Sequence, residues 1–192
     1  WLAWLDVEPR RLEMLSALLS EEEKTRAGRF RSHKDRNRFI VARGFLRHVL
    51  ARYLRVSPER ICFRYTPHGK PMLAPISASA EVRFSLCHSQ GLALCAVALE
   101  RDVGVDLERV RFDCAAKEIA ARFFSAQEQA AILSLPEPAR TVTFFRYWTV
   151  KEACLKATGL GLWSGLQGLV IALGEDEARV LRWGEAKPHD EK

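Results

Sequence analysis

The stretch FFRYWTVKEACLKATGLGL, residues Phe144–Leu162, decides how the whole sequence is interpreted. Its bulky apolar residues and the glycines at its end predict a long helix followed by a loop. Trp148, Glu152 and Lys156 are spaced at i, i+4 and i+8, so they share one face of this helix, with Lys151 beside them. These charges either form a surface salt bridge, worth only about a few tenths of a kcal/mol, or they are directed at a charged ligand.

The composition is typical of a soluble globular protein, with 48% hydrophobic and 28% charged residues among 192. This length allows one domain or two small halves. The sequence has no run of about 18 apolar residues, and its first residues do not match a signal peptide, so we expect neither a transmembrane helix nor secretion. An odd number of cysteines without a CxxC pair favours a reduced cytoplasm over a zinc site or disulfide framework: Cys62, Cys87, Cys95, Cys114 and Cys154.

The charge distribution suggests an anionic partner. The formal net charge is +6 and the isoelectric point is near 9.3, values that a generic basic surface would explain equally well. The segment 26–55 is more specific, because it concentrates arginine and lysine and has Asp35 as its only acidic residue. Such a local field suits phosphate groups or an acidic protein surface.

The N-terminal part is expected to contain a strand and two helices. Residues 1–8 are typical of a short strand. Ser20 followed by Glu23 matches a capping box and predicts a helix start. Apolar residues at helical spacing extend to about Leu54, and a break near residues 31–34 divides the segment into two helices.

Strand-like segments follow. ICFRY (61–65) is typical of a strand, and the Pro and Gly content of TPHGKPMLAP (66–75) predicts a loop. Three further runs are expected to be strands with tight connections between them: VRFSLC (82–87), LALCAVAL (92–99) and VGVDLE (103–108).

The C-terminal part is expected to be helical and then to end in a hairpin. Helical patterns cover residues 114–133 and, after a proline-containing break, residues 141–157. GLGLWSGLQG (159–168) is a glycine-rich loop. The remaining segments are a strand, a second strand and a frayed tail: 168–173, 178–183 and 184–192.

Two carboxylates in GVDLE are candidate metal ligands. On a strand, Asp106 and Glu108 would share one face, about 7 Å apart, with Val105 and Leu107 facing the core. Carboxylates suit Mg²⁺, which is often held by only one or two of them together with phosphates and water. Two solvent-facing acids are the alternative. Glu152 would supply a third carboxylate, while Lys151 and Lys156 would hold phosphate oxygens.

Five motifs in order carry a family resemblance. GVDLE (104–108) and WTVKEACLK (148–156) match the paired signature G-[VI]-D-x-E and [FW]-[ST]-x-K-E-[AS]-x-x-K. With RFFSAQEQAAI (122–132), GKP (69–71) and HS (88–89), the sequence from about residue 21 to 161 resembles the 4′-phosphopantetheinyl transferases. Its length is similar to that of the surfactin-synthetase-activating class.

The resemblance implies an α+β fold in which two similar halves form an intramolecular pseudo-dimer. The halves would be residues 1–102 and 103–192, with one site between them. The implied reaction moves the 4′-phosphopantetheine arm of coenzyme A to a serine of an apo acyl or peptidyl carrier protein. The products are holo-carrier protein and 3′,5′-ADP. Mg²⁺, or Mn²⁺ in its place, would be required.

The resemblance also implies roles for individual residues. Asp106, Glu108 and Glu152 would bind the metal. Glu152 and Lys156 would be catalytic, with Glu152 as candidate general base acting directly or through water. The residues that would contact coenzyme A are Arg26, Lys70, His88, Lys151 and Lys156, and Lys151 could instead hold the neighbouring glutamate in place.

Several residues depart from the family pattern or have a second interpretation. Cys87 replaces a serine, which is expected to weaken a phosphate hydrogen bond, and Phe39 replaces a small hydroxylated residue. Glu23 lies where a basic residue is common. Glu128 either assists near the metal or completes a capping box with Ser125.

The expected partners are coenzyme A and an acidic carrier protein that docks on the basic surface, without nucleic acid or membrane, and we expect a monomer. Two alternatives remain at this point. One is a basic RNA- or nucleotide-binding module without chemistry, and the other is a relative that binds coenzyme A or a carrier without transfer.

Overall fold

The computed structural model describes residues 1–74, 81–113, 116–159, 166 and 168–184. The chain divides into two compact units, residues 1–103 and 104–192. Each unit contains helices together with antiparallel strands, which confirms the predicted α+β class.

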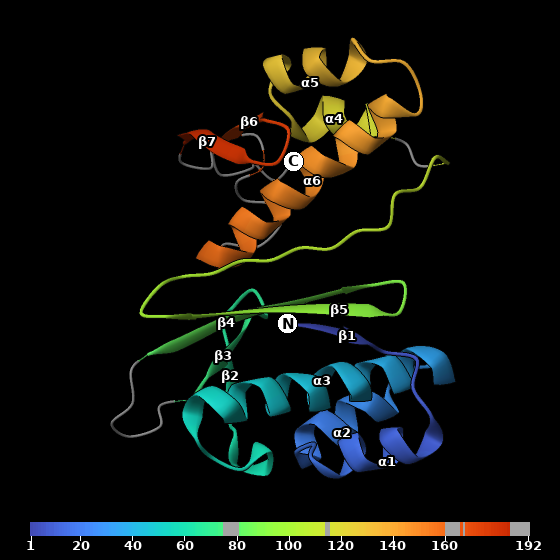
Figure 1. Ribbon diagram of the computed structural model, residues 1–192, viewed down its shortest axis with the longest axis vertical. Helices are drawn as coiled ribbons and strands as arrows, with labels where there is room; N and C mark the ends of the chain where they lie inside the picture. Colours follow the sequence, from blue (N-terminus) through green and yellow to red (C-terminus); the bar gives the residue numbers. More distant parts are fainter. Residues whose placement is uncertain (75–80, 114–115, 160–165, 167, 185–192) are drawn as a thin grey trace, which may run out of the picture. The chain divides into compact units, whose positions relative to one another are not determined.

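The first unit is built on a three-stranded antiparallel sheet with the order β1–β5–β4 (Figure 1). Its strands are β1 (Leu2–Trp4), β4 (Val82–Ser89) and β5 (Leu92–Leu99), and they confirm the three strands predicted there. Gln90 and Gly91 connect β4 to β5 with φ values of 48° and 89°, as the twist of a two-residue hairpin turn requires.

Two of the helices of this unit start at caps that the sequence specifies. Helix α2 (Glu21–Gly28) begins after Ser20 with the predicted capping box, and α3 (His33–Leu54) begins after Ser32, whose hydroxyl accepts a hydrogen bond from the Asp35 amide. The predicted break between two helices is therefore confirmed. Helix α3 packs on the sheet through a core of apolar side chains: Leu46, Val49, Leu50, Phe84 and Cys95.

Helix α1 (Pro9–Ala17) was not predicted from the sequence. It has nine residues, and no side chain caps its first turn, so its local signal is weak. Its position depends on tertiary contact, because Leu15 is buried against α3 at Gly44. A Cβ atom at Gly44 would lie 2.8 Å from the Leu15 Cβ.

The predicted loop 66–75 is partly wrong. Strand β2 (Phe63–Tyr65) pairs with β3 (Pro71–Leu73), so part of the segment returns as a hairpin. Gly69 has φ of 81°, and the Thr66 carbonyl accepts a hydrogen bond from its amide. The positive φ of this glycine therefore allows the tight turn that pairs β2 with β3, despite the prolines in the segment. A 3₁₀ turn precedes the hairpin at Pro58–Arg60.

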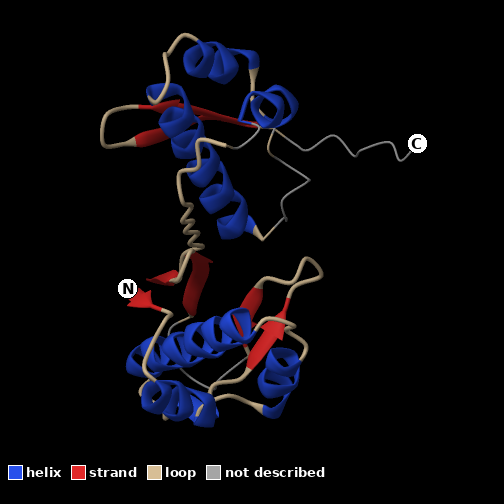
Figure 2. Cartoon of the chain, turned by 90° about the vertical axis from the view of Figure 1, so that its right-hand side faces the viewer, coloured by secondary structure: helices blue, strands red, loops and turns tan. Residues whose placement is uncertain are grey.

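The second unit packs three helices against a hairpin (Figure 2). The elements are α4 (Ala116–Phe123), α5 (Ala126–Leu133), α6 (Ala139–Thr158), β6 (Leu169–Leu173) and β7 (Ala178–Trp183). They confirm the predicted helix 141–157 and the final hairpin, whereas the helical pattern 114–133 forms two helices divided at residues 124–125. Most of the glycine-rich loop and the tail after residue 184 lie outside the described residues. Among the described helices, none is long and apolar enough to cross a bilayer.

The predicted strand 103–108 is wrong. Residues 103–108 are irregular and extend no described sheet. The cause is close packing on α6: a Cβ atom at Gly104 would lie 1.7 Å from the Ala153 carbonyl oxygen and 2.6 Å from the Ala157 amide nitrogen. The glycine thus lets this segment lie directly on the helix backbone, where no partner strand could pair with it.

Candidate active site

The three charged residues of the motif on helix α6 lie in three different environments. Lys151 is fully buried, Glu152 is 5% exposed, and the side chain of Lys156 is 34% exposed. The helix stops at Gly159, whose φ of 74° is the left-handed conformation common at helix C-termini. The charges therefore do not form one solvated stripe, and the surface salt-bridge interpretation is wrong.

Asp106 and Glu152 present two unsatisfied carboxylate oxygens. Lys156 Nζ lies 2.5 Å from Asp106 Oδ1. The other Asp106 oxygen, Oδ2, and Glu152 Oε1 are buried and have no hydrogen-bond partner among the described residues. Buried polar atoms normally have partners, so this pair of oxygens requires a proton or a cation.

The pKa of Glu152 is raised by the burial of its carboxyl group and by the nearby charge of Asp106. Burial is the largest cause and the charge of Asp106 is the next, and together they raise the pKa from 4.5 to about 7. Lys156 opposes the shift, and Glu108 adds to it. The protonated form of this carboxyl group is therefore favoured when no cation is present.

Glu108 is not equivalent to Asp106. Its side chain is exposed, whereas the Asp106 side chain is 5% exposed, so the two do not follow the alternation expected of a strand. Within the described part of the chain, no group of three His, Cys, Asp or Glu side chains is placed to hold a metal ion. Asp106 and Glu152 nevertheless fit Mg²⁺, because it often takes two carboxylates and fills its other positions with phosphate and water.

Lys151 is engaged with protein atoms. Its Nζ lies 2.9 Å from Glu128 Oε2 and donates hydrogen bonds to the carbonyl oxygens of Leu166 and Leu169. An ammonium group has three donors, and these three partners are protein groups. The structure therefore favours a structural role for Lys151 over the predicted contact with coenzyme A.

Glu128 completes a capping box with Ser125, the second of the two roles considered for it. Its carboxylate accepts a hydrogen bond from the Ser125 amide at 2.7 Å, and Ser125 Oγ accepts one from the Glu128 amide, which completes the capping box. Oε1 also accepts a hydrogen bond from the Ile171 amide of β6. Glu128 thus joins α5, α6 and β6 from within the core.

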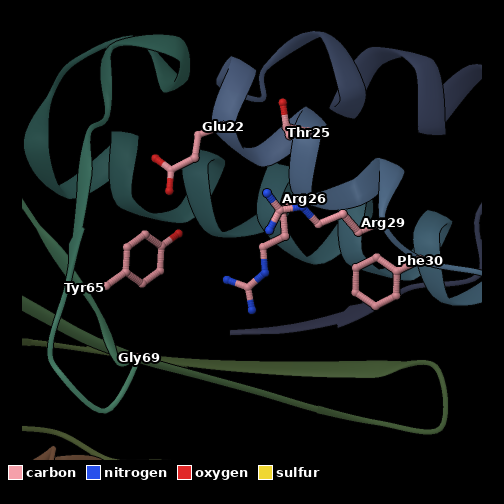
Figure 3. A pocket seen from close by; sticks show the side chains of 7 residues that line it. All are labelled: Glu22, Thr25, Arg26, Arg29, Phe30, Tyr65 and Gly69. Atoms are coloured by element: carbon pink, nitrogen blue, oxygen red, sulfur yellow. The ribbon is translucent and has the colours of Figure 1, made fainter.

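A cation-lined cavity of about 750 Å³ lies in the first unit. Figure 3 shows the Arg26 side chain extending from α2 into the space between Tyr65 and Phe30. Of the predicted residues, Arg26 lines this cavity, whereas Arg29 and Tyr65 were not singled out from the sequence. The basic run 26–55 was the available signal for Arg29. The complete lining is Glu22, Thr25, Arg26, Arg29, Phe30, Tyr65 and Gly69.

Phe39 contacts two residues that line the cavity. Its ring lies 5.3 Å from that of Phe30, and the Arg26 guanidinium lies 5.5 Å from its centroid. The residue that departs from the family pattern therefore makes a cation–π contact with a cavity residue.

Lys70 follows the cavity residue Gly69 in the β2–β3 turn. It is half-buried, and burial is the main reason why its pKa is lowered; Asp102 opposes the shift and Arg83 adds to it. Burial disfavours the charged form of this lysine, and a bound anion beside it would stabilise that form.

His88 and Cys87 lie on opposite faces of β4. His88 is exposed, whereas Cys87 is buried with its thiol 3.7 Å from the Leu94 carbonyl oxygen. The burial of Cys87 argues against the expected effect on a phosphate hydrogen bond, because successive residues of a strand face opposite sides. The cysteine packs in the core, and the exposed position next to it belongs to His88.

Comparison with known proteins identifies the family. Residues 102–191 match the model of the 4′-phosphopantetheinyl transferase superfamily, and residues 3–100 match that of the 4′-phosphopantetheinyl transferase N-terminal domain. The chain belongs to this superfamily and is a transferase, which confirms the resemblance.

Individual relatives support the same family. The chain is 42% identical to the 4′-phosphopantetheinyl transferase HetI of Nostoc sp., over 97% of this chain and 78% of that protein. It is 34% identical to psf-1 of Bacillus pumilus, over 90% and 72%, and 27% identical to Sfp of Bacillus subtilis, over 85% and 70%. Both are named as 4′-phosphopantetheinyl transferases.

Proposed function

We propose that this chain transfers the 4′-phosphopantetheine arm of coenzyme A to a serine of an apo acyl or peptidyl carrier protein. Holo-carrier protein and 3′,5′-ADP are the products. The observation that carries the proposal is the pair of buried, partnerless oxygens of Asp106 and Glu152 beside Lys156. Family membership supports the transfer reaction over a basic RNA-binding module.

Asp106 and Glu152 would hold Mg²⁺ or Mn²⁺, with Glu108 as a further ligand. When bound, the ion supplies positive charge to the pyrophosphate of coenzyme A. Its binding requires an ionised Glu152, so protons and metal compete for the same carboxylate.

Glu152 and Lys156 would act on the reacting atoms. The serine oxygen forms a bond to the β-phosphorus, the bond from that phosphorus to the bridging oxygen breaks, and 3′,5′-ADP leaves with this oxygen. Glu152 accepts the serine proton directly or through water. Lys156 neutralises charge on a phosphate oxygen.

The first unit would bind the nucleotide end of coenzyme A. Arg26 and Arg29 provide guanidinium groups in the cavity, and Lys70 and His88 add a cation and an imidazole. We further propose that the enzyme works as a cytoplasmic monomer whose basic surface docks an acidic carrier protein, and that it uses neither nucleic acid nor a membrane.

The intact mass of an apo carrier protein, incubated with this chain, coenzyme A and Mg²⁺, tests the proposal. We expect a gain of one phosphopantetheine that disappears with EDTA and with Glu152→Ala. The exposed Glu118 of α4 provides the matched control, Glu118→Ala, which should leave the gain intact. A chain that binds coenzyme A but modifies no carrier would instead be a binding relative without transferase activity.

A further inference from the structure

A buried ion cluster lies beneath the cation-lined cavity of the first unit. Glu23, Arg43 and Arg47 are 3%, 6% and 1% exposed. Arg43 Nε lies 2.5 Å from Glu23 Oε1, and Arg47 Nη2 lies 2.7 Å from Glu23 Oε2. One carboxylate of α2 is therefore held by two guanidinium groups of α3.

Glu23 also fixes the start of its own helix. Its Oε2 accepts a hydrogen bond from the Ser20 amide at 3.0 Å. Burial alone would raise the pKa of Glu23, but Arg43, the Ser20 amide and Arg47 outweigh it and lower the pKa overall, so the group is charged. The same side chain thus determines where α2 begins and how α2 lies on α3.

The cluster reaches the cavity by two routes. The first is α2, because Arg26 and Arg29 lie on this helix and at its end, three and six positions after Glu23, and line the cavity. The second is the β2–β3 hairpin, because Arg43 Nη2 donates to the Tyr65 hydroxyl at 3.3 Å and Tyr65 also lines the cavity.

Further contacts make the cluster rigid. The Arg43 and Arg47 guanidinium groups lie 4.3 Å and 5.3 Å from the centroid of the Phe63 ring on β2. Arg47 also donates to the carbonyl oxygens of Pro58 and Ile61, which precede the hairpin. Both walls of the cavity are therefore anchored to one buried carboxylate.

We propose that Glu23 is a positioning residue for coenzyme A: it holds α2 and Tyr65 so that the cavity is formed before the anionic nucleotide enters. This inference rests on the proposed function, in which that cavity binds the nucleotide. Preorganised charges bind an anion more tightly, since less ordering is required on binding. Glu23 touches no substrate and acts through Arg26, Arg29 and Tyr65.

Steady-state kinetics at varied coenzyme A distinguish positioning from a merely structural role. Glu23→Gln should raise KM for coenzyme A by about tenfold and change kcat by less than about twofold. Loss of stability alone would reduce the amount of active protein, which lowers apparent kcat and leaves KM unchanged. Glu21→Gln is the matched control on the same helix, because the Glu21 side chain is 88% exposed, and it should change neither constant.

A double-mutant cycle with Arg26→Ala tests the route through α2. If Glu23 acts by placing Arg26, the two changes should be non-additive: Glu23→Gln should add less than about threefold to KM once Arg26 is absent. Full additivity would overturn the positioning role. An unchanged KM in Arg26→Ala alone would show that the cavity is not the nucleotide site and would remove the inference together with that part of the proposed function.

Tyr65→Phe keeps the test decisive if Glu23→Gln does not fold. Tyr65 is 37% exposed, so loss of its hydroxyl should leave the fold intact. We expect KM for coenzyme A to rise by about threefold at constant kcat, because the hairpin wall is then held less firmly. An unchanged KM would contradict the route through Arg43.

Discussion

Each unit contains one buried glutamate that completes a capping box, and the two differ in what they hold. Glu23 and Glu128 begin short helices after Ser20 and Ser125, and both are almost fully buried. Glu23 is paired with Arg43 and Arg47 below a cavity lined by cations. Glu128 is paired with Lys151, the residue directly before the metal-ligand candidate Glu152.

The comparison shows how one local motif can support opposite electrostatic sites. In the first unit the buried cluster supports Arg26 and Arg29, which suit phosphate. In the second unit it supports the helix that carries Glu152, whose free oxygen suits a cation. In each unit, burying an ion pair costs free energy, and the buried pair supports a neighbouring site of one charge sign.

The largest effect should follow loss of Glu128. Glu128→Gln leaves the Lys151 ammonium buried without a counter-charge, so we expect the free energy of unfolding to fall by about 3–5 kcal/mol. Urea unfolding measures this, with Glu118→Gln as the exposed control. Replacing both partners, Glu128→Gln with Lys151→Met, should recover part of the loss; a double variant as unstable as the single one would contradict the pairing.

Gly104→Ala should be nearly as damaging. The new Cβ atom would clash with the Ala153 carbonyl oxygen. This oxygen belongs to the backbone of α6 and cannot move without disrupting the helix. Segment 103–108 must therefore shift, and Asp106 shifts with it. We expect a loss of about 1–3 kcal/mol and a transfer rate at least about tenfold lower. Gly28→Ala is the control, because its Cβ atom would meet nothing within 4 Å.

The stability of the metal-free protein should depend on pH through Glu152. Its pKa is raised from 4.5 to about 7 on folding, so the folded state retains a proton that the unfolded chain has released. This contribution is complete below pH 4.5 and is lost as pH rises through about 7. Thermal unfolding in EDTA should show the loss in the wild type, and Glu152→Gln should lack it. Parallel profiles would contradict the assignment.

The smallest effect is expected at Arg38. Its guanidinium makes two hydrogen bonds to Asp6, whose side chain is 57% exposed. Arg38→Ala should therefore cost no more than about 1 kcal/mol and leave KM for coenzyme A unchanged. A tenfold rise in KM would place Arg38 in the nucleotide site of the first unit and contradict its assignment to a surface ion pair.

Local signals in the sequence account for most of the elements. Capping residues at Ser20 and Ser125 and the apolar periodicity of α3 and α6 suffice to predict those helices. Helix α1 and the 103–108 segment could not be derived in this way, because their conformations depend on packing at Gly44 and Gly104. Sequence alone does not reveal which helix a glycine will touch.

The site was predictable in its chemical groups and less so in their surroundings. The motif identifies Lys151, Glu152 and Lys156 together, yet the first is neutralised by Glu128, which lies 23 positions earlier in the sequence. Arg29 and Tyr65 belong to no quoted motif, and they line one cavity although Arg29 follows α2 and Tyr65 lies on β2. Such partnerships require tertiary structure.

The most direct test of the account compares Arg26→Ala and Glu152→Gln in the same transfer assay, with carrier mass as the readout. The proposed function places coenzyme A binding in the first unit and chemistry in the second. Arg26→Ala should therefore raise KM for coenzyme A by about tenfold with kcat retained, and Glu152→Gln should lower kcat by at least about 100-fold. A normal kcat in Glu152→Gln, or a loss of kcat alone in Arg26→Ala, would contradict this division.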